Sequence, residues 1–437
     1  MSFDDEVLPV LADVFISSCQ VLEAQAGRPV GSESGYAQDL AAEVASRFAA
    51  LLAPAFVAMS APDAQPPVQD APPTALDRAE AEMLFQRLAP LSQDDRLLVV
   101  AKGRHYQTPA LCERLCEESV YWAAKIVEEA RRWADLALIV AGRICGDEAN
   151  WAKGIGYAWA FVGNAQRVAN KFPAVDAAFA RSREFYALGR DGLHGWFPEA
   201  RALDLEASLR RDQGQHTRAL ALHDRALDGC QDSSRARLLL NQAATLEQAG
   251  WPERALLSLE EARPAIERGE GELRFRWVLR FSMVKNLVHL YRAPEADALL
   301  PELRQIAAES GNDLDQLRTR VLSGEVLAGL RRWNEALAEL SAARDEFTAL
   351  KLWADAAVVG LEEAVILLED DRTAKVRTLV RAMKPIFDSL GLKREALASY
   401  RLFLAAVERE AATATMAREL AKAIERVGKL MDGPAAG

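Results

Sequence analysis

The sequence predicts an all-α fold, an α-solenoid or superhelix of antiparallel helix pairs with an N-terminal helical hairpin. Apolar residues recur at helical spacing along almost the whole chain, and essentially no strand-like alternation follows residue 75. Gly, Pro, Asp and Asn interrupt the helical pattern at short intervals, so the predicted helices have similar lengths and come in pairs. Half of the 437 residues are hydrophobic, which is enough to build a large core. These features are typical of a helical array rather than of a single bundle.

Residues 1–60 are predicted to form an acidic helical hairpin. Apolar residues repeat at helical spacing in 7–22 and again in 37–59, and the Gly- and Ser-containing sequence between them is typical of a loop. Two helices bury little surface, so we expect the hairpin to depend on the rest of the protein, a second copy or a partner. A linker is predicted at 61–75, where five prolines within twelve residues prevent a helix from continuing.

The helical pattern after the linker divides into three parts. Residues 76–150 form a degenerate helical region, 151–350 carry the clearest repeats, and 351–431 are degenerate C-terminal repeats followed by a frayed tail at 432–437. The helices are predicted at 76–91, 109–129, 130–143, 151–170, 174–188, 197–213, 216–228, 234–248, 252–268, 273–291, 294–309, 314–330, 333–350, 354–369, 373–390, 394–409 and 411–431.

Small residues lie at a fixed internal spacing in three of the predicted helix pairs. The second small residue follows the first by twelve positions, and the third follows by a further seven. Where two antiparallel helices cross closely, only a small side chain lets their backbones approach. The triplets are Ala207, Ala219 and Ala226, then Ala243, Ala255 and Ala262, then Gly324, Ala336 and Ala343, with room for a weaker unit around Ala296.

With these residues aligned, the chain resembles the tetratricopeptide-repeat (TPR) family, whose units are helix-turn-helix pairs. It departs from the family's pattern at Val175, which replaces a small residue, in lacking most of the final prolines, and in spacings longer than the family's 34 residues. The resemblance covers about 151–350 and is expected to extend over 76–431. The matching residues are Trp159, Gly163, Asn164, Ala165, Phe172 and Phe179 in one unit, Gly214 and Gly250 on inter-helix turns, and Trp333 at the start of a second helix.

The resemblance implies that the first helices of successive pairs line a concave surface that binds a protein or peptide partner. Any single polar residue placed there by the alignment could equally belong to a solvated helix face. The alignment places on this surface Tyr157, Asn164, Arg167, Arg201, Asp204, Ser208, Arg211, Arg237, Glu247, Arg318 and Glu325.

Arginines and aromatic residues are interleaved in residues 272–292. Arg274, Arg276 and Arg280 accompany Trp277 and Phe281, and the segment contains a single acidic residue. Such a combination suits an acidic peptide, which would be held by charge-assisted hydrogen bonds and by stacking. The alternative is that Trp277 and Phe281 are core residues and that the arginines pair with neighbouring acids.

The motifs of common enzyme and metal sites are missing from the sequence. It contains no phosphate-binding Gly-Lys-Ser/Thr loop and no His-Glu-x-x-His pair, and in the glycine-flanked segment 31–35 the nucleophile position holds Glu33. Cys112 and Cys116 lie one helical turn apart, but no second ligand pair follows at zinc spacing, so we expect buried thiols. The sequence therefore predicts a protein that is not an enzyme and that needs no cofactor or metal.

Charge and hydropathy restrict the compartment and the partners. The net charge is −11, of which residues 1–76 supply −8, so the charge argues against nucleic acid firmly for the N-terminal part and only weakly for the repeats. The first ten residues hold three acids and no basic residue, and five cysteines are an odd number, so we expect reduced thiols and a cytoplasmic location. The longest uncharged stretch, 48–62, is too short for a membrane crossing, which needs roughly 20 apolar residues.

These features support three functional hypotheses. The first is a scaffold or adaptor that binds a peptide or protein partner in the concave groove. The second is a ligand- or peptide-responsive regulator, of a bacterial type, in which the N-terminal hairpin is the output module. The third is an accessory subunit of an enzyme complex.

Overall fold

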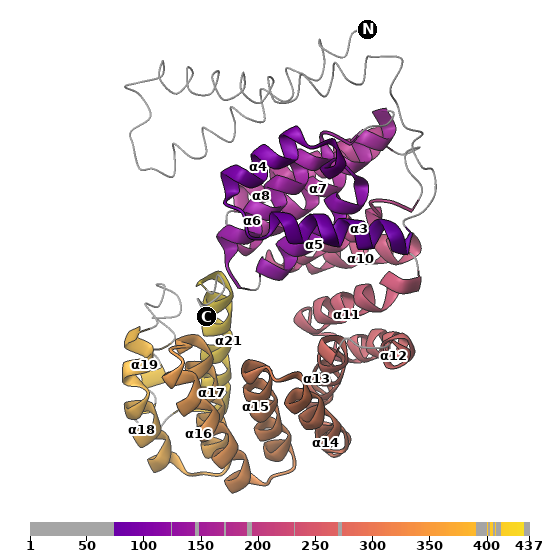
Figure 1. Ribbon diagram of the computed structural model, residues 1–437. Helices are drawn as coiled ribbons and strands as arrows, with labels where there is room; N and C mark the ends of the chain where they lie inside the picture. The colour runs from indigo at the N-terminus through magenta and orange to yellow at the C-terminus, as the bar shows by residue number, and fades with distance from the viewer. Residues whose placement is uncertain are drawn as a thin grey trace, which may run out of the picture. The chain divides into compact units, whose positions relative to one another are not determined.

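In the computed structural model, every regular element is helical, which confirms the predicted all-α class for the part of the chain described (Figure 1). The predicted hairpin at 1–60, nearly all of the linker, most of the helix at 394–409 and the tail lie outside that part. No helix within it is both long and apolar enough to cross a membrane. The structure describes residues 74–123, 125–144, 148–169, 172–189, 195–230, 232–269, 273–389, 400, 403–404, 407 and 412–431.

The described residues fall into two compact units, 74–206 and 207–431. Within the first unit, α3 packs on α5, α5 packs on α7, and α4 packs on α6, so α3, α5 and α7 are the first helices of successive pairs. Helix α9 begins in this unit and ends in the second. The elements are α3 (Ala75–Leu88), α4 (Gln93–Lys102), the 3-10 turn η1 (Arg104–Tyr106), α5 (Pro109–Ala123), α6 (Val127–Ala141), α7 (Glu148–Val168), α8 (Phe172–Leu188) and α9 (Glu199–Asp212).

Two predictions for the first unit were wrong. The sequence pattern missed α4, whose start is fixed by Ser92, which accepts a hydrogen bond from the Asp95 backbone N–H. The boundary between the helices predicted at 109–129 and 130–143 was placed too late, because the backbone is extended at Ile126 and the second helix begins directly after it. Glu128 and Glu129 occupy the first turn of that second helix, where acidic side chains interact favourably with the helix dipole.

The second unit repeats one arrangement of helix pairs. Helices α11, α13, α15 and α17 contact one another in succession and lie closer together than their partner helices do. A row of helix pairs curves toward the side on which neighbouring helices are closer together. The first helices therefore lie on the inner side of the curve. The elements are α10 (His216–Asp228), α11 (Asp232–Gln248), α12 (Pro252–Arg268), α13 (Leu273–His289), α14 (Ala293–Ser310), α15 (Asp313–Gly329), α16 (Trp333–Ala349), α17 (Trp353–Glu369), α18 (Thr373–Ala382), α19 (Lys384–Ser389) and α21 (Ala414–Met431).

The C-terminal end of this unit corrects another prediction. The helix predicted at 373–390 is interrupted at Met383, whose side chain is buried and whose backbone separates α18 from α19. Helix α21 packs directly on α17. Val365, Phe403, Leu420 and Ile424 belong to one apolar core cluster, which closes this end of the unit.

The turn inside each helix pair of the second unit has the same backbone geometry. Gly214 and Gly250 adopt positive φ, as expected for inter-helix turns, and Tyr291, Arg331 and Asp371 do the same without being glycine. The N–H of the next residue bonds to a carbonyl five residues earlier, as in the 2.9 Å bond from Trp251 to Leu246, which is a Schellman motif. Positions 250, 291, 331 and 371 are 41, 40 and 40 residues apart, so the repeat here is longer than 34 residues.

The predicted small residues lie at close helix contacts. All eight alanines of the three triplets are at most 1% exposed, as is Ala296 in the weaker unit between them. A Cβ atom on Gly324 of α15 would lie only 2.7 Å from Cγ of Leu340 on α16, and Leu340 is fully buried. The pattern therefore identified positions where the helix backbones come close.

We expect Gly324→Ala to destabilise the second unit. Alanine favours a helix by about 1 kcal/mol relative to glycine, but overpacking against Leu340 costs about 1–3 kcal/mol. The measurement is urea unfolding followed by circular dichroism. Gly229→Ala, after α10, is the control, because a Cβ atom there would meet only the Arg225 carbonyl oxygen, at an ordinary contact distance of 3.7 Å. A Gly324→Ala variant as stable as the wild type would contradict the packing argument.

Candidate binding site

An open cleft of about 470 Å³ lies between two first helices of the first unit, α3 and α5. Phe85 comes from α3, and the other lining residues come from one face of α5. That face presents residues at the i, i+3, i+4 and i+7 positions, while the opposite face of α5, including Cys112 and Cys116, is buried in the core. The α5 residues that line the cleft are Arg114, Glu117, Glu118 and Tyr121.

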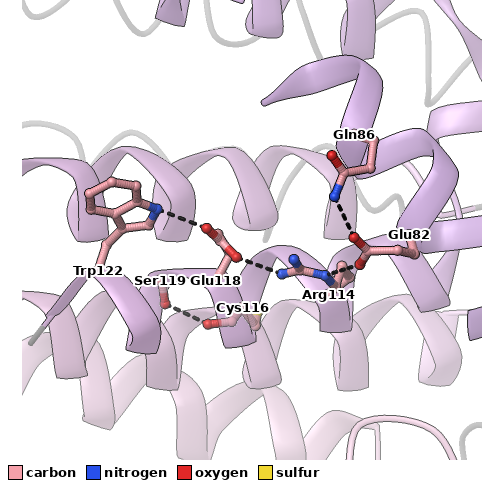
Figure 2. A network of polar contacts seen from close by, with 7 residues as sticks. All are labelled: Glu82, Gln86, Arg114, Cys116, Glu118, Ser119 and Trp122. Carbon is pink, nitrogen blue, oxygen red and sulfur yellow. Dashed lines mark hydrogen bonds and ion pairs between the residues drawn. The ribbon is translucent and has the colours of Figure 1, made fainter. Parts of the chain in front are cut away.

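Arg114 links α5 to α3 beside this cleft, and Figure 2 shows its contacts with Glu82 and Glu118. Its Nε lies 2.6 Å from a carboxylate oxygen of Glu82 on α3, and its Nη1 lies 2.8 Å from Glu118. Gln86 donates a hydrogen bond to Glu82, and the indole N–H of Trp122 donates one to Glu118. The Arg114 hydrogen bond is the main reason that the pKa of Glu82 is lowered.

The Arg114 guanidinium also lies 3.8 Å from the centre of the Phe85 ring, a cation–π contact. This contact and the two carboxylates hold the guanidinium at the wall of the cleft. The arrangement gives the cleft one fixed positive group and an aromatic surface.

A second arginine, Arg201 of α9, lies behind Glu117. Its Nη2 is 3.2 Å from Glu117, its Nη1 is 3.2 Å from Asp204, and only 6% of the residue is exposed. Burial acts to lower the pKa of Arg201, but the charges of Glu117 and Asp204 outweigh it and raise the pKa. The guanidinium therefore stays charged inside the protein, and Glu117 connects it to the cleft.

Glu113, one turn before Glu117, lies where burial disfavours the charged form of its carboxyl group. Its carboxylate accepts a 2.8 Å hydrogen bond from the backbone N–H of Phe197, a residue held at φ 52° just before α9. Burial raises the pKa of Glu113 to about 7; the Phe197 N–H and the charge of Arg78 act against this rise, and the charge of Glu117 adds to it.

Aromatic rings pack beneath these polar groups. The ring of Tyr157 lies 4.8 Å from that of Phe161 and 5.3 Å from that of Phe197, between centres. Tyr157 is 3% exposed, and burial is the largest cause of its raised pKa.

The structure brings three of the residues predicted from the alignment together: Arg201 forms an ion pair with Asp204, and the Arg201 charge acts on the hydroxyl of Tyr157. Asn164 is buried as well and accepts a 3.0 Å hydrogen bond from Arg167. Whether these side chains contact a partner stays a prediction. Further along α9, Ser208 is 7% exposed and Arg211 lies 3.6 Å from Asp212.

In the second unit, three residues of the segment 272–292 are placed as the alternative interpretation has it: Trp277 is in the core, and Arg274 and Arg280 pair with acids. Trp277 is buried, and its indole N–H donates a 3.1 Å hydrogen bond to Thr319 on α15. Arg274 pairs with Asp315 and lies 4.8 Å from the Trp277 ring centre, and Arg280 lies within 2.8 Å of both Glu267 and Glu302. An acidic peptide would have to replace those carboxylates, so its binding here stays a prediction.

The other predicted residues of the second unit are half-buried. Glu247 of α11 lies 2.8 Å from Lys285 of α13, an ion pair between neighbouring first helices. The half-buried residues are Arg237, Arg276, Arg318 and Glu325.

Sequence reasoning missed the residues on α5, although one signal for them was present. Glu113 and Glu117 have i, i+4 spacing, which places two like charges on one helix face and is unfavourable in isolation. Such a pair indicates a cation from elsewhere in the chain, and the structure supplies Arg201, 84 residues away from Glu117. No local pattern indicates which arginine is the partner.

The cysteines do not add a metal site to this region. Cys112 and Cys116 are fully buried on the core face of α5, as predicted, and the Cys112 thiol donates to the Ala137 carbonyl at 3.5 Å. Within the residues described, no group of three His, Cys, Asp or Glu side chains could hold a metal ion.

Glu113→Gln should change the pH dependence of stability. A carboxyl whose pKa is about 7 in the folded chain and 4.5 otherwise makes the folded state less stable as the pH rises from 4.5 to 7. Glutamine keeps the acceptor for the Phe197 N–H but cannot ionise. The variant should therefore gain up to about 3 kcal/mol on the wild type between pH 5 and pH 8 in urea unfolding.

Glu184→Gln is the control for this measurement, since the Glu184 side chain on α8 is 59% exposed. Its difference from the wild type should be the same at both pH values. A pH-independent difference for Glu113→Gln would show that the Glu113 carboxyl does not lose its proton in this range.

Comparisons with known proteins support the fold. No protein-family model and no curated protein matches the sequence. Among solved structures, the crystal structure of the apo form of RapI is similar, with a TM-score of 0.50 and 11% sequence identity over 74% of this chain and 99% of the RapI chain. At that identity the likeness concerns the fold alone, and together with the all-helical paired structure it places the chain among helical-repeat proteins.

Proposed function

We propose that this chain is a non-enzymatic, TPR-like scaffold or adaptor of the cytoplasm that holds a peptide, or an extended segment of a protein partner, on its first helices. The observation that carries the proposal is the open cleft of about 470 Å³ between α3 and α5, lined by charged and aromatic side chains. Ligand sites commonly have volumes of about 300–1,000 Å³ and combine apolar surface with a few placed polar groups.

The form of the cleft favours a peptide over an enclosed small molecule. It is open to solvent and not an enclosed cavity, so an extended chain could lie across it. Tyr121 at the cleft is 52% exposed, and such large, rigid aromatic side chains are frequent anchors at interfaces. The fold shared with RapI, a protein described in an apo form, is also consistent with ligand binding.

A photo-crosslinker at position 121 tests this proposal. Tyr121→p-benzoylphenylalanine in the full chain, irradiated in cells, should give an adduct whose mass spectrum locates a peptide segment on α5. The same substitution at Tyr291 is the control, because this residue is 95% exposed but lies on the α13–α14 turn. Identical adducts from both positions, or none from position 121, would count against binding at this cleft.

A further inference from the structure

Helix α3 carries apolar side chains on two of its faces. Ala81, Leu84 and Leu88 are buried in the core, whereas Leu76 is 76% exposed and Met83 is 60% exposed. Leu76 and Met83 are seven residues apart, so they lie two turns apart on one outer face of the helix. A helix with apolar residues on more than one face is typical of one that is covered on more than one face.

The last described helix of the second unit has a different outer face. Helix α21 packs on α17 with Leu420 and Ile424 buried, and its exposed residues include Arg418, Glu419 and Lys422. A helix that ends a row of repeats needs such a polar outer face, because no neighbour covers it. Helix α21 meets this requirement, whereas the outer face of α3 does not. This difference indicates that α3 is not the first helix of its row.

The chain that precedes α3 contains a segment with a matching apolar face. In residues 37–59, which lie outside the part of the chain described, Leu40, Val44, Phe48 and Leu51 recur at helical spacing and fall on one stripe of the predicted helix. That stripe needs a surface to cover it, as the outer face of α3 does.

The linker allows the two faces to meet. Residues 61–73 would span about 40 Å in an extended, proline-rich conformation, whereas the 14 residues of α3 span about 21 Å. Residues 37–59 can therefore reach the whole length of α3. Segments that are consecutive in a chain usually pack side by side, and a short connection gives the attached segment a high effective concentration over a second copy of the chain.

From these observations we propose that residues 37–59 pack as a helix on the outer face of α3 formed by Leu76 and Met83, and so extend the row of first helices by one. Of the three possible supports for the N-terminal hairpin, this selects the rest of the protein. Helix α3 also supplies Phe85 to the cleft, so the N-terminal segment would hold the helix that forms one wall of the proposed binding site.

A photo-crosslinker on the outer face of α3 tests the inference. Met83→p-benzoylphenylalanine in the purified full-length protein, after irradiation and proteolysis, should give an adduct within one chain between α3 and residues 37–59. Leu76→p-benzoylphenylalanine should reach the same segment from a position two turns away. The control is the same substitution at Leu257 of α12, which is 71% exposed and should give no adduct with this segment.

Hydrogen exchange measured by mass spectrometry gives an independent readout. In the Leu76→Glu/Met83→Glu variant, amides of residues 37–59 should exchange at least about tenfold faster than in the wild type, because two apolar contacts are replaced by charges. Exchange in α5 to α8 should not change, since both substituted side chains lie outside the core. Leu257→Glu is the control and should leave exchange in residues 37–59 unchanged.

Every other outcome would overturn the inference. Adducts to a different part of the chain, or no adduct from either position on α3, would show that residues 37–59 do not cover this face. Adducts between two chains, with a dimer in analytical ultracentrifugation, would assign the face to a second copy. Equal exchange of residues 37–59 in the wild type and the Leu76/Met83 variant would place the support of this segment elsewhere.

Discussion

The close approach of neighbouring helices is the constraint on which the rest of this structure depends. A single helix pair cannot bury its apolar faces, so each pair must pack against the next one. In the first unit, a Cβ atom on Gly156 would lie 3.0 Å from the Ser182 carbonyl oxygen, and one on Gly163 would lie 3.0 Å from the Phe179 ring. Larger side chains there would hold α7 and α8 apart, and α7 would no longer meet α5 in the same register.

Because the first helices are close, polar residues between them find partners on the neighbouring helix. Trp277 of α13 donates to Thr319 of α15, and Lys285 of α13 pairs with Glu247 of α11. Buried polar groups need such partners, since an unsatisfied one costs free energy. This explains why so many residues that the TPR alignment assigned to partner binding are ion-paired or hydrogen-bonded within the chain: the same row of helices supplies both kinds of contact.

The sequence predicted the class, the pairing and many helix bounds, but not the site. His216–Asp228 and Pro252–Arg268 were predicted to the residue, because Gly or Pro marks their ends. The turns at Tyr291, Arg331 and Asp371 carry no glycine, so the sequence did not predict their shared positive-φ geometry. The alignment selected Tyr157, Arg201 and Asp204 one by one as expected partner contacts, whereas Glu113 and Glu117 belong to a region without recognisable repeats. Their contacts to Phe197 and Arg201 span 84 residues, a separation that local patterns do not encode.

Helix α5 is the place in the first unit where local rules are broken together. Two like charges share one face, a carboxyl is buried with a pKa of about 7, and its hydrogen-bond donor Phe197 is a non-glycine residue at positive φ. Each of these three features costs free energy by itself. An apolar face on α5 would pack against the start of α9 at a lower cost in free energy. Natural chains keep such combinations mainly where a surface serves binding or catalysis. The cleft adjoins this set of residues through Glu117, which is why we propose the binding site at α5 rather than at the more regular pairs of the second unit.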